Sequence, residues 1–449
     1  MSFKIYHKER KSNGRRDIYI LGIKVFSYKR KIDDVYASLS IEEIAEIQSN
    51  YKIIEQNIIK KKQNNEKIKV AFLVGLSSMF PAKSIMDEML KDADFDVKLV
   101  IIPDFRFGIE HCNENLEKSY KEYYEKYKDI ILLSSPDITK DNIKIEDIAD
   151  IVFLPVPYDI SHSKYNLLNL IQKGLLPAFI NYSFYNAKYD RNQLISSVVF
   201  SLYWKIFVDT KLNLEEFKEY SLLKGKNAVL TGYCKMDEFA NIKRTSIRKT
   251  IMIAPHHSID GGFNDIMALS NFPKYADLFL ELPKLYPDID FIFRPHPALF
   301  PLLERKKFWG IEKVKNYIEK MKSNKNVIYS DYGNYLQDFI NSDGIIQDCG
   351  SFLTEYFYTL KPQCYMLKDT SDIENKFISL GKQCLENSYI AYNKEDIIKF
   401  IDNVIIRGND HKQPQRENFA KTEIMLNYPE ATSYAVNCIK GIILKERKR

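Results

Sequence analysis

The sequence Asp-Phe-Ile-Phe-Arg-Pro-His-Pro (residues 290–297) is an apolar run that ends in a basic turn. The same design occurs at Ile-Met-Ile-Ala-Pro-His-His-Ser (251–258) and at Gly-Ile-Ile-Gln-Asp-Cys-Gly-Ser-Phe (344–352), where a helical run follows. Short apolar runs bounded by turn residues are typical of strands buried in a parallel sheet. Because α/β sheets bind ligands at the carboxyl ends of their strands, we expect the three turns to lie together at one site.

Apolar runs of strand length recur along the whole chain and alternate with helical segments. They are residues 69–74, 97–102, 130–133, 151–154, 178–182, 198–208 and 228–237 in the first half, and 251–254, 290–293, 327–329, 344–347 and 363–367 in the second. This alternation predicts an α/β protein of GT-B-like outline, with two doubly wound, Rossmann-like domains that face a cleft. The same outline serves sugar-nucleotide epimerases, so the fold does not decide the function.

Charged stretches divide the chain. In residues 41–62 the apolar residues recur at helical spacing, and the end of this stretch is rich in charged residues. The charged residues 241–250 connect the two halves. We therefore predict four parts: an N-terminal basic extension and helix (1–66), an N-terminal Rossmann-like acceptor domain (67–244), a C-terminal nucleotide-donor domain (245–411), and a C-terminal helical tail that crosses back (412–449).

The composition is that of a globular protein, with 45% apolar and 28% charged residues. A net charge of +6 is too small to predict a nucleic-acid partner. The basic excess is concentrated, since residues 1–31 hold ten Lys and Arg and the chain ends in Lys-Glu-Arg-Lys-Arg (445–449). Residues 16–31 predict two short strands around Gly22. Such basic ends suit an anionic membrane surface, and solvated tails are an equal alternative.

Six cysteines are scattered without a Cys-x-x-Cys pair, which argues against a zinc ribbon or a disulfide framework and fits a reducing compartment. No apolar segment follows the basic N-terminus, and no run is long enough to span a membrane. The sequence therefore predicts a cytoplasmic protein, with peripheral association at the inner face of the cell membrane as a hypothesis.

The turn Arg294-Pro-His-Pro is expected to bind an anion. The two prolines restrain the backbone on either side of His296, and Arg294 can grip phosphate oxygens in a bidentate manner. His296 can add a hydrogen bond or a proton. His256 and His257 end a neighbouring strand. Because adjacent residues point apart, we expect only one of them to face the cleft, and we predict no metal site, since nothing has metal-ligand spacing.

The turn at 347–352 is a second candidate for anion binding. Gly350 and Ser351 let the backbone approach a ligand, and the N–H groups of the following helix favour negative charge. The structural alternative is an ordinary strand-to-helix turn with Ser351 as the N-cap. Asp348 and Glu355 are further candidates at the donor site, for the ribose or a lysine on the phosphate side. The alternative is that they interact only with each other across the helix start.

The opposite domain must supply a base near the acceptor hydroxyl. His162 follows the strand at 151–154 and is the histidine in the middle of that half, so it is our candidate base, with Asp159 nearby. The alternative is a surface loop histidine.

With these residues assembled, the second half resembles the CDP-glycerol glycerophosphotransferase family of teichoic acid and capsule synthesis. Thr-Gly-Tyr-Cys-Lys-Met-Asp (231–237) is similar to that family's Thr-Gly-x-x-Arg-x-Asp, and Arg294-Pro-His-Pro is similar to its Arg-x-His-Pro. The run 343–355, leading to Leu360-Lys-Pro, resembles its Asp-Tyr-Ser-Ser-x-x-x-Asp helix start and downstream Lys-Pro. Cys349 and Gly350 replace Tyr-Ser, Glu355 replaces Asp, and the family's Trp-His-Gly-Thr motif is not recognisable.

The resemblance implies donor binding in the C-terminal half, with Arg294, His296, Gly350 and Ser351 at the diphosphate. It also implies a CDP-activated polyol donor, transfer of its phosphate-linked unit to a hydroxyl of a glycan or lipid-linked acceptor, and no cofactor. Two alternatives stay open. One is a glycosyltransferase that uses a nucleotide sugar with the same diphosphate site, and the other is a non-catalytic scaffold that binds polymer or membrane through its basic ends.

Overall fold

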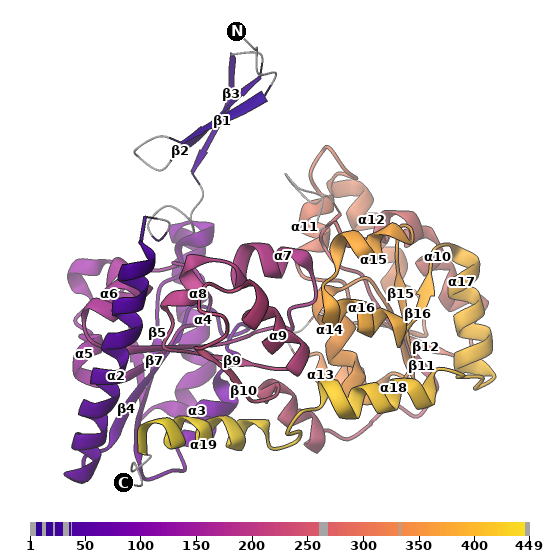
Figure 1. The fold of residues 1–449 in the computed structure, drawn as a ribbon. Coiled ribbons are helices and arrows are strands. Elements are labelled where there is room, and N and C mark those ends of the chain that lie inside the picture. The colour runs from indigo at the N-terminus through magenta and orange to yellow at the C-terminus, as the bar shows by residue number, and fades with distance from the viewer. Residues whose placement is uncertain are drawn as a thin grey trace.

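The structure, a computed structural model, describes residues 6–10, 15–20, 23–29, 36, 38–259, 268–331 and 334–444. Two parallel sheets, one in each half of the chain, form its frame (Figure 1). We refer below to the N-terminal half, which carries the first of these sheets, and to the C-terminal half, which carries the second.

The N-terminal half is built on a seven-stranded parallel sheet of order β10-β9-β8-β7-β4-β5-β6. Its strands are β4 (Ile68–Val74), β5 (Phe95–Ile101), β6 (Ile131–Leu133), β7 (Ile151–Phe153), β8 (Leu176–Ile180), β9 (Lys205–Val208) and β10 (Ala228–Leu230). Strand β4 is buried on both faces, because Val70 and Phe72 join one apolar cluster while Ala71 and Leu73 join another. A strand covered on both faces needs a continuous apolar run, and β4 has one.

Helices cover both faces of this sheet. They are α2 (Ile41–Gln63), α3 (Lys83–Met89), α4 (Ile109–Tyr127), α5 (Ile145–Ile148), α6 (Leu167–Gln172), α7 (Lys188–Asp190), α8 (Val198–Leu202) and α9 (Lys211–Tyr220). The start of α2 is set by a capping box: the Ser40 hydroxyl accepts from the N–H of Glu43 (3.1 Å), and the Glu43 carboxylate accepts from the N–H of Ser40 (2.7 Å).

The prediction of one strand over residues 198–208 is wrong for its first part. Val198–Leu202 is helix α8, capped by Ser197, whose hydroxyl accepts from the N–H of Phe200 (3.4 Å). Strand β9 begins only at Lys205. A short apolar run buried on all sides has the same composition in a helix and in a strand, so its periodicity does not separate the two.

The C-terminal half is built on a six-stranded parallel sheet of order β13-β12-β11-β14-β15-β16. Its strands are β11 (Thr250–Ala254), β12 (Asp290–Phe293), β13 (Val327–Tyr329), β14 (Gly344–Gln347), β15 (Gln363–Met366) and β16 (Tyr389–Ala391). Its helices are α10 (Phe272–Leu285), α11 (Leu299–Leu303), α12 (Ile311–Lys322), α13 (Leu336–Asn341), α14 (Gly350–Glu355), α15 (Ser371–Lys376), α16 (Ser379–Glu386) and α17 (Lys394–Lys399).

Strand β11 lies between β12 and β14, and this order brings the three predicted turns side by side. Ile253 is paired with Phe293 of β12, and Ala254 is paired with Gln347 of β14. The residues that follow these strands therefore emerge from adjacent positions at the carboxyl edge of the sheet, which is where α/β sheets bind ligands.

The end of the chain returns to the N-terminal half. After α18 (Gln413–Phe419) the chain runs into α19 (Ala431–Leu444), which packs against α2 and α3 (Figure 1). Ala435, Ile439 and Ile443 of α19 are buried in the apolar cluster of the first sheet. Lys440 adds ion pairs with Asp92 (2.6 Å) and Asp94 (2.7 Å).

A three-stranded antiparallel sheet precedes α2: β1 (Tyr6–Arg10), β2 (Arg15–Ile20) and β3 (Ile23–Lys29). Strands β2 and β3 flank Gly22, where two strands are predicted, and β1 is an additional strand. The basic side chains of this region and residues 445–449 lie outside the described residues. Across the described part of the chain, no helix combines the length and apolar character needed to cross a membrane.

Candidate active site

A cavity of about 720 Å³ lies between the two halves. From the N-terminal half it is lined by Ser78, Met79, Tyr182, Ser183, Phe184, Asn186, Ala187, Tyr189, Asp190 and Leu194, and from the segment after β10 by Lys235. From the C-terminal half it is lined by Ala254, Pro255, His256, His257, Leu269, Arg294, Pro295, His296, Pro297, Phe300, Ile318, Tyr329, Ser330, Asp331, Tyr335, Cys349, Gly350, Ser351, Phe352 and Glu355. Most of the residues predicted for the donor site therefore share one cavity.

His256, His257 and His296 form a compact group, called here the histidine cluster. The ring centroids of His256 and His257 are 4.2 Å apart, and those of His257 and His296 are 4.1 Å apart. The expectation that the two adjacent histidines point apart is wrong. They follow the end of β11 in a turn rather than in an extended strand, so side chains at neighbouring positions can face the same side.

Burial favours the neutral form of all three imidazoles. Burial, and then the proximity of His257 and His296, holds the pKa of His256 well below its usual range. Burial also lowers the pKa of His257 and lowers that of His296 to about 4. The cluster therefore offers lone pairs and N–H groups rather than positive charge.

Hydrogen bonds define which nitrogen carries the proton in two of the rings. The Nδ1 of His296 accepts from the backbone N–H of Ala298 (3.1 Å). The Nδ1 of His256 accepts from the N–H of Ser258 (3.3 Å) and lies 2.7 Å from the Ser258 hydroxyl, which itself accepts from the N–H of Leu269 (3.2 Å). Because both Nδ1 atoms are acceptors, the proton of each neutral ring is on Nε2.

This arrangement suits an anion better than a metal ion. One ring nitrogen from each histidine lies within 4.8 Å of the other two, which is close enough to consider a metal. A metal-binding histidine normally donates its other ring N–H to an acceptor, but the partners of Nδ1 in His256 and His296 are donors. The two Nε2–H groups are instead ready to donate to a phosphate oxygen.

Arg294 lines the cavity but is already paired. Its Nη1 donates to the Asp338 carboxylate (2.7 Å) and to the Ser330 hydroxyl (2.7 Å), and the Asp338 side chain is only 3% exposed. The guanidinium carbon lies 5.8 Å from the centre of the Tyr335 ring. Some of the N–H groups of Arg294 that were expected to bind a ligand are therefore bonded to Asp338 and Ser330, which hold the side chain in place.

Asp348 does not line the cavity, so its expected contact with the donor is not found. It is fully buried, and its carboxylate accepts from the backbone N–H groups of His256 (2.7 Å) and Asn271 (2.5 Å). Burial raises the pKa of Asp348 to about 7 despite these bonds. Asp348 therefore anchors the turn that carries the histidine cluster.

Glu355 lines the cavity and is 1% exposed. Its Oε1 accepts from the Tyr233 hydroxyl (3.0 Å), while Oε2 has no hydrogen-bond partner among the described residues. A buried carboxylate oxygen without a partner is available to a ligand hydroxyl.

Gly350 and Ser351 also line the cavity, at the start of α14. The alternative that Ser351 is the N-cap is wrong, because the cap position is Cys349 and the Ser351 hydroxyl lies 3.3 Å from the Cys349 sulfur. The carbonyl of Gly350 accepts from the Asn186 side chain (2.7 Å), which reaches across from the N-terminal half. The N-terminal half thus helps to position this turn.

His162 is not among the cavity residues. Its Nε2 is bonded to the carbonyl of Ser135 (2.9 Å), and its ring packs on Phe105 at 5.0 Å. Asp159 accepts from the Tyr36 hydroxyl (2.8 Å), so both candidate residues of the turn after β7 have partners within their own half.

Asp190 is the residue that the sequence analysis missed. It lines the cavity from the N-terminal half, and its Oδ2 accepts from the N–H groups of Asn186 (3.0 Å) and Ala187 (2.9 Å). Burial raises the pKa of Asp190 to about 6. Asp190 lies in the segment that follows β8 at the carboxyl edge of the sheet. The histidine turns were predicted because α/β sheets bind ligands at the carboxyl ends of strands, and the same reasoning would have identified this segment.

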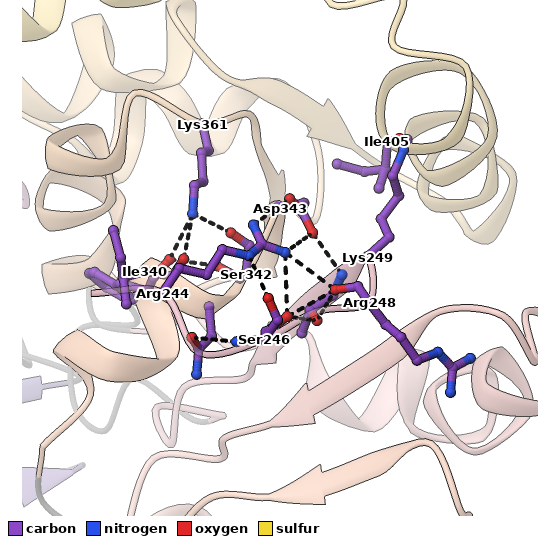
Figure 2. Close-up of polar contacts among 12 residues, drawn as sticks. Arg244, Ser246, Arg248, Lys249, Ile340, Ser342, Asp343, Lys361 and Ile405 are labelled. Carbon is purple, nitrogen blue, oxygen red and sulfur yellow. Dashed lines mark hydrogen bonds and ion pairs between the residues drawn. The ribbon is translucent and has the colours of Figure 1, made fainter. Parts of the chain in front are cut away.

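Lys361 belongs to the Lys-Pro pair that resembles the family motif. It lies at the amino edge of the sheet, opposite the cavity. It precedes β15, and Figure 2 shows it next to Arg244 and Asp343, which precede β11 and β14. Its ammonium donates to the carbonyls of Ile340 (2.8 Å) and Ser342 (2.5 Å) at the end of α13, and burial lowers its pKa to about 8. These residues stabilise the amino edge of the sheet, opposite the cavity.

No protein-family model matches the chain, and no curated protein matches it in sequence. Solved structures do match in fold. The wall teichoic acid polymerase TagF has a TM-score of 0.54 at 14% identity, over 91% of this chain and 96% of that one. A UDP-GlcNAc 2-epimerase from Neisseria meningitidis, bound to UDP-GlcNAc, has a TM-score of 0.53 at 15% identity, over 83% and 99% of the two chains.

The S. aureus protein MnaA, solved with UDP, has a TM-score of 0.52 at 13% identity, over 85% of this chain and 99% of that chain. These likenesses extend over nearly the whole of each neighbour and agree with the two facing parallel sheets described above. The fold of this chain is therefore GT-B-like.

Proposed function

We propose that this protein is a transferase that moves a polyol-phosphate unit from a CDP-activated donor, similar to CDP-glycerol, to a hydroxyl of a surface glycopolymer. The observation that carries the proposal is the histidine cluster, which presents neutral N–H donors beside Arg294 in the cavity between the halves. TagF, one of the structural neighbours, has been solved after a soak with CDPG.

The donor diphosphate would lie against the histidine cluster. The acceptor oxygen would attack the phosphorus that carries the polyol, forming a new P–O bond. The bond from that phosphorus to the bridging oxygen breaks, and CMP leaves with the electron pair. Hydrogen bonds from His256 and His296 would stabilise the charge on the phosphate oxygens, which is the main contribution of a protein to phosphoryl transfer.

The hydroxyl proton must go to a base on the acceptor side. We propose Asp190 for this role in place of His162, because Asp190 lines the cavity and His162 does not. A carboxylate with a pKa of about 6 is ionised at neutral pH and is still basic enough to accept a proton in the transition state. Glu355 would hold a ribose hydroxyl of the donor through its unpartnered oxygen.

A second candidate function is an enzyme that acts on a nucleotide sugar. It is favoured by the epimerase neighbours, whose TM-scores equal those of TagF within 0.02. In the glycosyltransferase form of this candidate, the acceptor attacks the anomeric carbon and the nucleoside diphosphate leaves. The diphosphate would occupy the same histidine cluster. A glycan or lipid-linked acceptor, and a membrane surface contacted through the basic termini, remain part of either proposal.

Calorimetric titration with CMP, CDP, CDP-glycerol, UDP, UDP-GlcNAc and GDP tests the proposal. We expect selective binding of the cytidine series, weakened at least tenfold in His296→Gln, with Lys361→Met as a matched control at the opposite edge of the sheet. Phosphorus transferred to the acceptor then identifies phosphoryl transfer. A preference for UDP ligands supports the second candidate, and the absence of any nucleotide binding contradicts both.

A further inference from the structure

The two walls of the cavity differ in the groups that can bind an anion. The C-terminal wall carries the Nε2–H groups of the histidine cluster and the Arg294 guanidinium, together with the acids Asp331 and Glu355. Two segments form the N-terminal wall, one after β4 and one after β8, and among their described cavity residues only Asp190 is an acid, with no Lys, Arg or His. Lys235, which follows β10, lies over the Tyr335 ring at 4.6 Å and so belongs to the donor side.

This wall does not suit a phosphate-bearing acceptor. The end of a polyol-phosphate chain carries at least one negative charge for each phosphate, and it would approach the Asp190 carboxylate, while the described cavity residues of this wall include no Lys, Arg or His. Arg106, whose charge acts on Tyr182, is already paired with Asp104. Phosphate-binding sites normally supply Arg or Lys, or oriented N–H groups, as the C-terminal wall does. This difference assigns the diphosphate to the wall with Arg294 and the histidine N–H donors, and an uncharged group to the other wall.

Aromatic rings and hydroxyl groups make up much of the N-terminal wall. Tyr189 is 40% exposed, Tyr182 is half-buried, and Ser78 and Ser183 lie among them. Binding sites for small polar molecules combine aromatic surfaces with a few placed polar groups that set the orientation. The apolar face of a sugar ring would pack on the tyrosines, while its hydroxyls would bond to the serines and to Asp190.

We infer that the acceptor is an uncharged sugar, bound by the wall that contains Tyr182, Tyr189 and Asp190, and not the phosphate-bearing end of a polyol-phosphate chain. This inference rests on the proposed function and specifies its acceptor. The transfer would then join a polyol phosphate to a neutral sugar hydroxyl, with the proton passing to Asp190 as the new P–O bond forms and CMP leaves.

Saturation-transfer NMR on the full chain, with CMP bound, tests the inference. The neutral probes are the methyl glycosides of glucose, galactose, rhamnose and N-acetylglucosamine, and the charged probe is bis(glycerol) phosphate. We expect transfer to at least one glycoside and none to the phosphate probe. Tyr189→Ala should reduce the glycoside signal at least fivefold, while Tyr189→Phe, which keeps the ring, should retain it.

A charge variant makes the test two-sided. Tyr189→Lys adds a cation at an exposed position and should raise the affinity for bis(glycerol) phosphate at least threefold. Signal from the phosphate probe alone, or from neither probe while CMP still binds, overturns the inference and leaves the nucleotide site standing. Loss of CMP binding in the unmodified chain contradicts the proposed function instead, so the two failures are distinguishable.

Discussion

The buried carboxylate of Asp348 accepts a hydrogen bond from the backbone N–H of His256 at 2.7 Å. The bond joins the carboxyl end of β14 to the turn after β11, and a second bond from Asn271 ties the same carboxylate to the start of α10. Asp348 therefore acts on the ligand site through the position of the histidine turn.

Replacing Asp348 by Asn should weaken nucleotide binding without removing a ligand contact. The amide keeps one acceptor oxygen but places an NH₂ group against a backbone N–H, and leaving a buried N–H without an acceptor costs about 1–3 kcal/mol. We expect lower thermal stability together with a higher Kd for CMP. The bond is unimportant for the site if the variant loses stability and binds CMP as tightly as the unmodified chain.

Removing Asp338 should destabilise the fold substantially. Its partner Arg294 has a side chain only 12% exposed, and breaking a buried ion pair by removing one member costs about 3–5 kcal/mol. Denaturant unfolding of Asp338→Asn, Arg294→Gln and the double variant gives the coupling between them. A coupling near zero would mean that Arg294 is held by its other contacts.

The histidine cluster should make stability fall in acid. His296 has a pKa of about 4 in the folded chain and about 6.5 when unfolded, so between these values only the unfolded chain binds the proton. Stability therefore falls as the pH drops from 6.5 towards 4, by about 1.6 kcal/mol for this residue between pH 6.5 and 5. His296→Gln should lose this component, so its free energy of unfolding should depend less on pH. Parallel curves for the two proteins would contradict the assigned shift.

Asp190 and His162 give opposite expectations for activity. Asp190→Asn removes the proposed base and should lower kcat by about 10²–10⁴-fold, whereas His162→Ala should stay within about twofold. If Asp190 is the base, the activity of the unmodified protein should fall as the pH drops through about 6, because the base must be ionised. Steady-state kinetics across pH measure both effects, and a His162 variant that loses turnover would restore the original candidate.

Lys361→Met should affect stability alone. It leaves the carbonyls of Ile340 and Ser342 without their donor, at a cost of about 1–3 kcal/mol. Because Lys361 lies at the amino edge of the sheet (Figure 2), the Kd for CMP should stay within about twofold. A larger change in Kd would show that this edge is coupled to the cavity.

Local patterns in the sequence were enough to predict the two parallel sheets and the three turns that meet at the cavity. Continuous apolar runs such as β4 specify buried strands, and Arg294-Pro-His-Pro marks a strand end through its prolines. The apolar run 198–208 marks the limit of this reasoning, because burial on all sides removes the periodicity that separates a helix from a strand.

Side-chain directions and long-range partners were decided only by the tertiary structure. The approach of His256, His257 and His296 depends on the pairing of β11 with β12, and the anchoring role of Asp348 depends on a turn 92 residues away. Similarly, His162 and Asp190 both follow strands of the same sheet. His162 packs against its own half, whereas Asp190 lines the cavity. The sequence by itself determined most strands of the two parallel sheets and the strand ends where polar side chains gather, because both follow from local composition. Which side chains meet there was settled by the order of strands and the packing of loops, which join residues far apart in the chain.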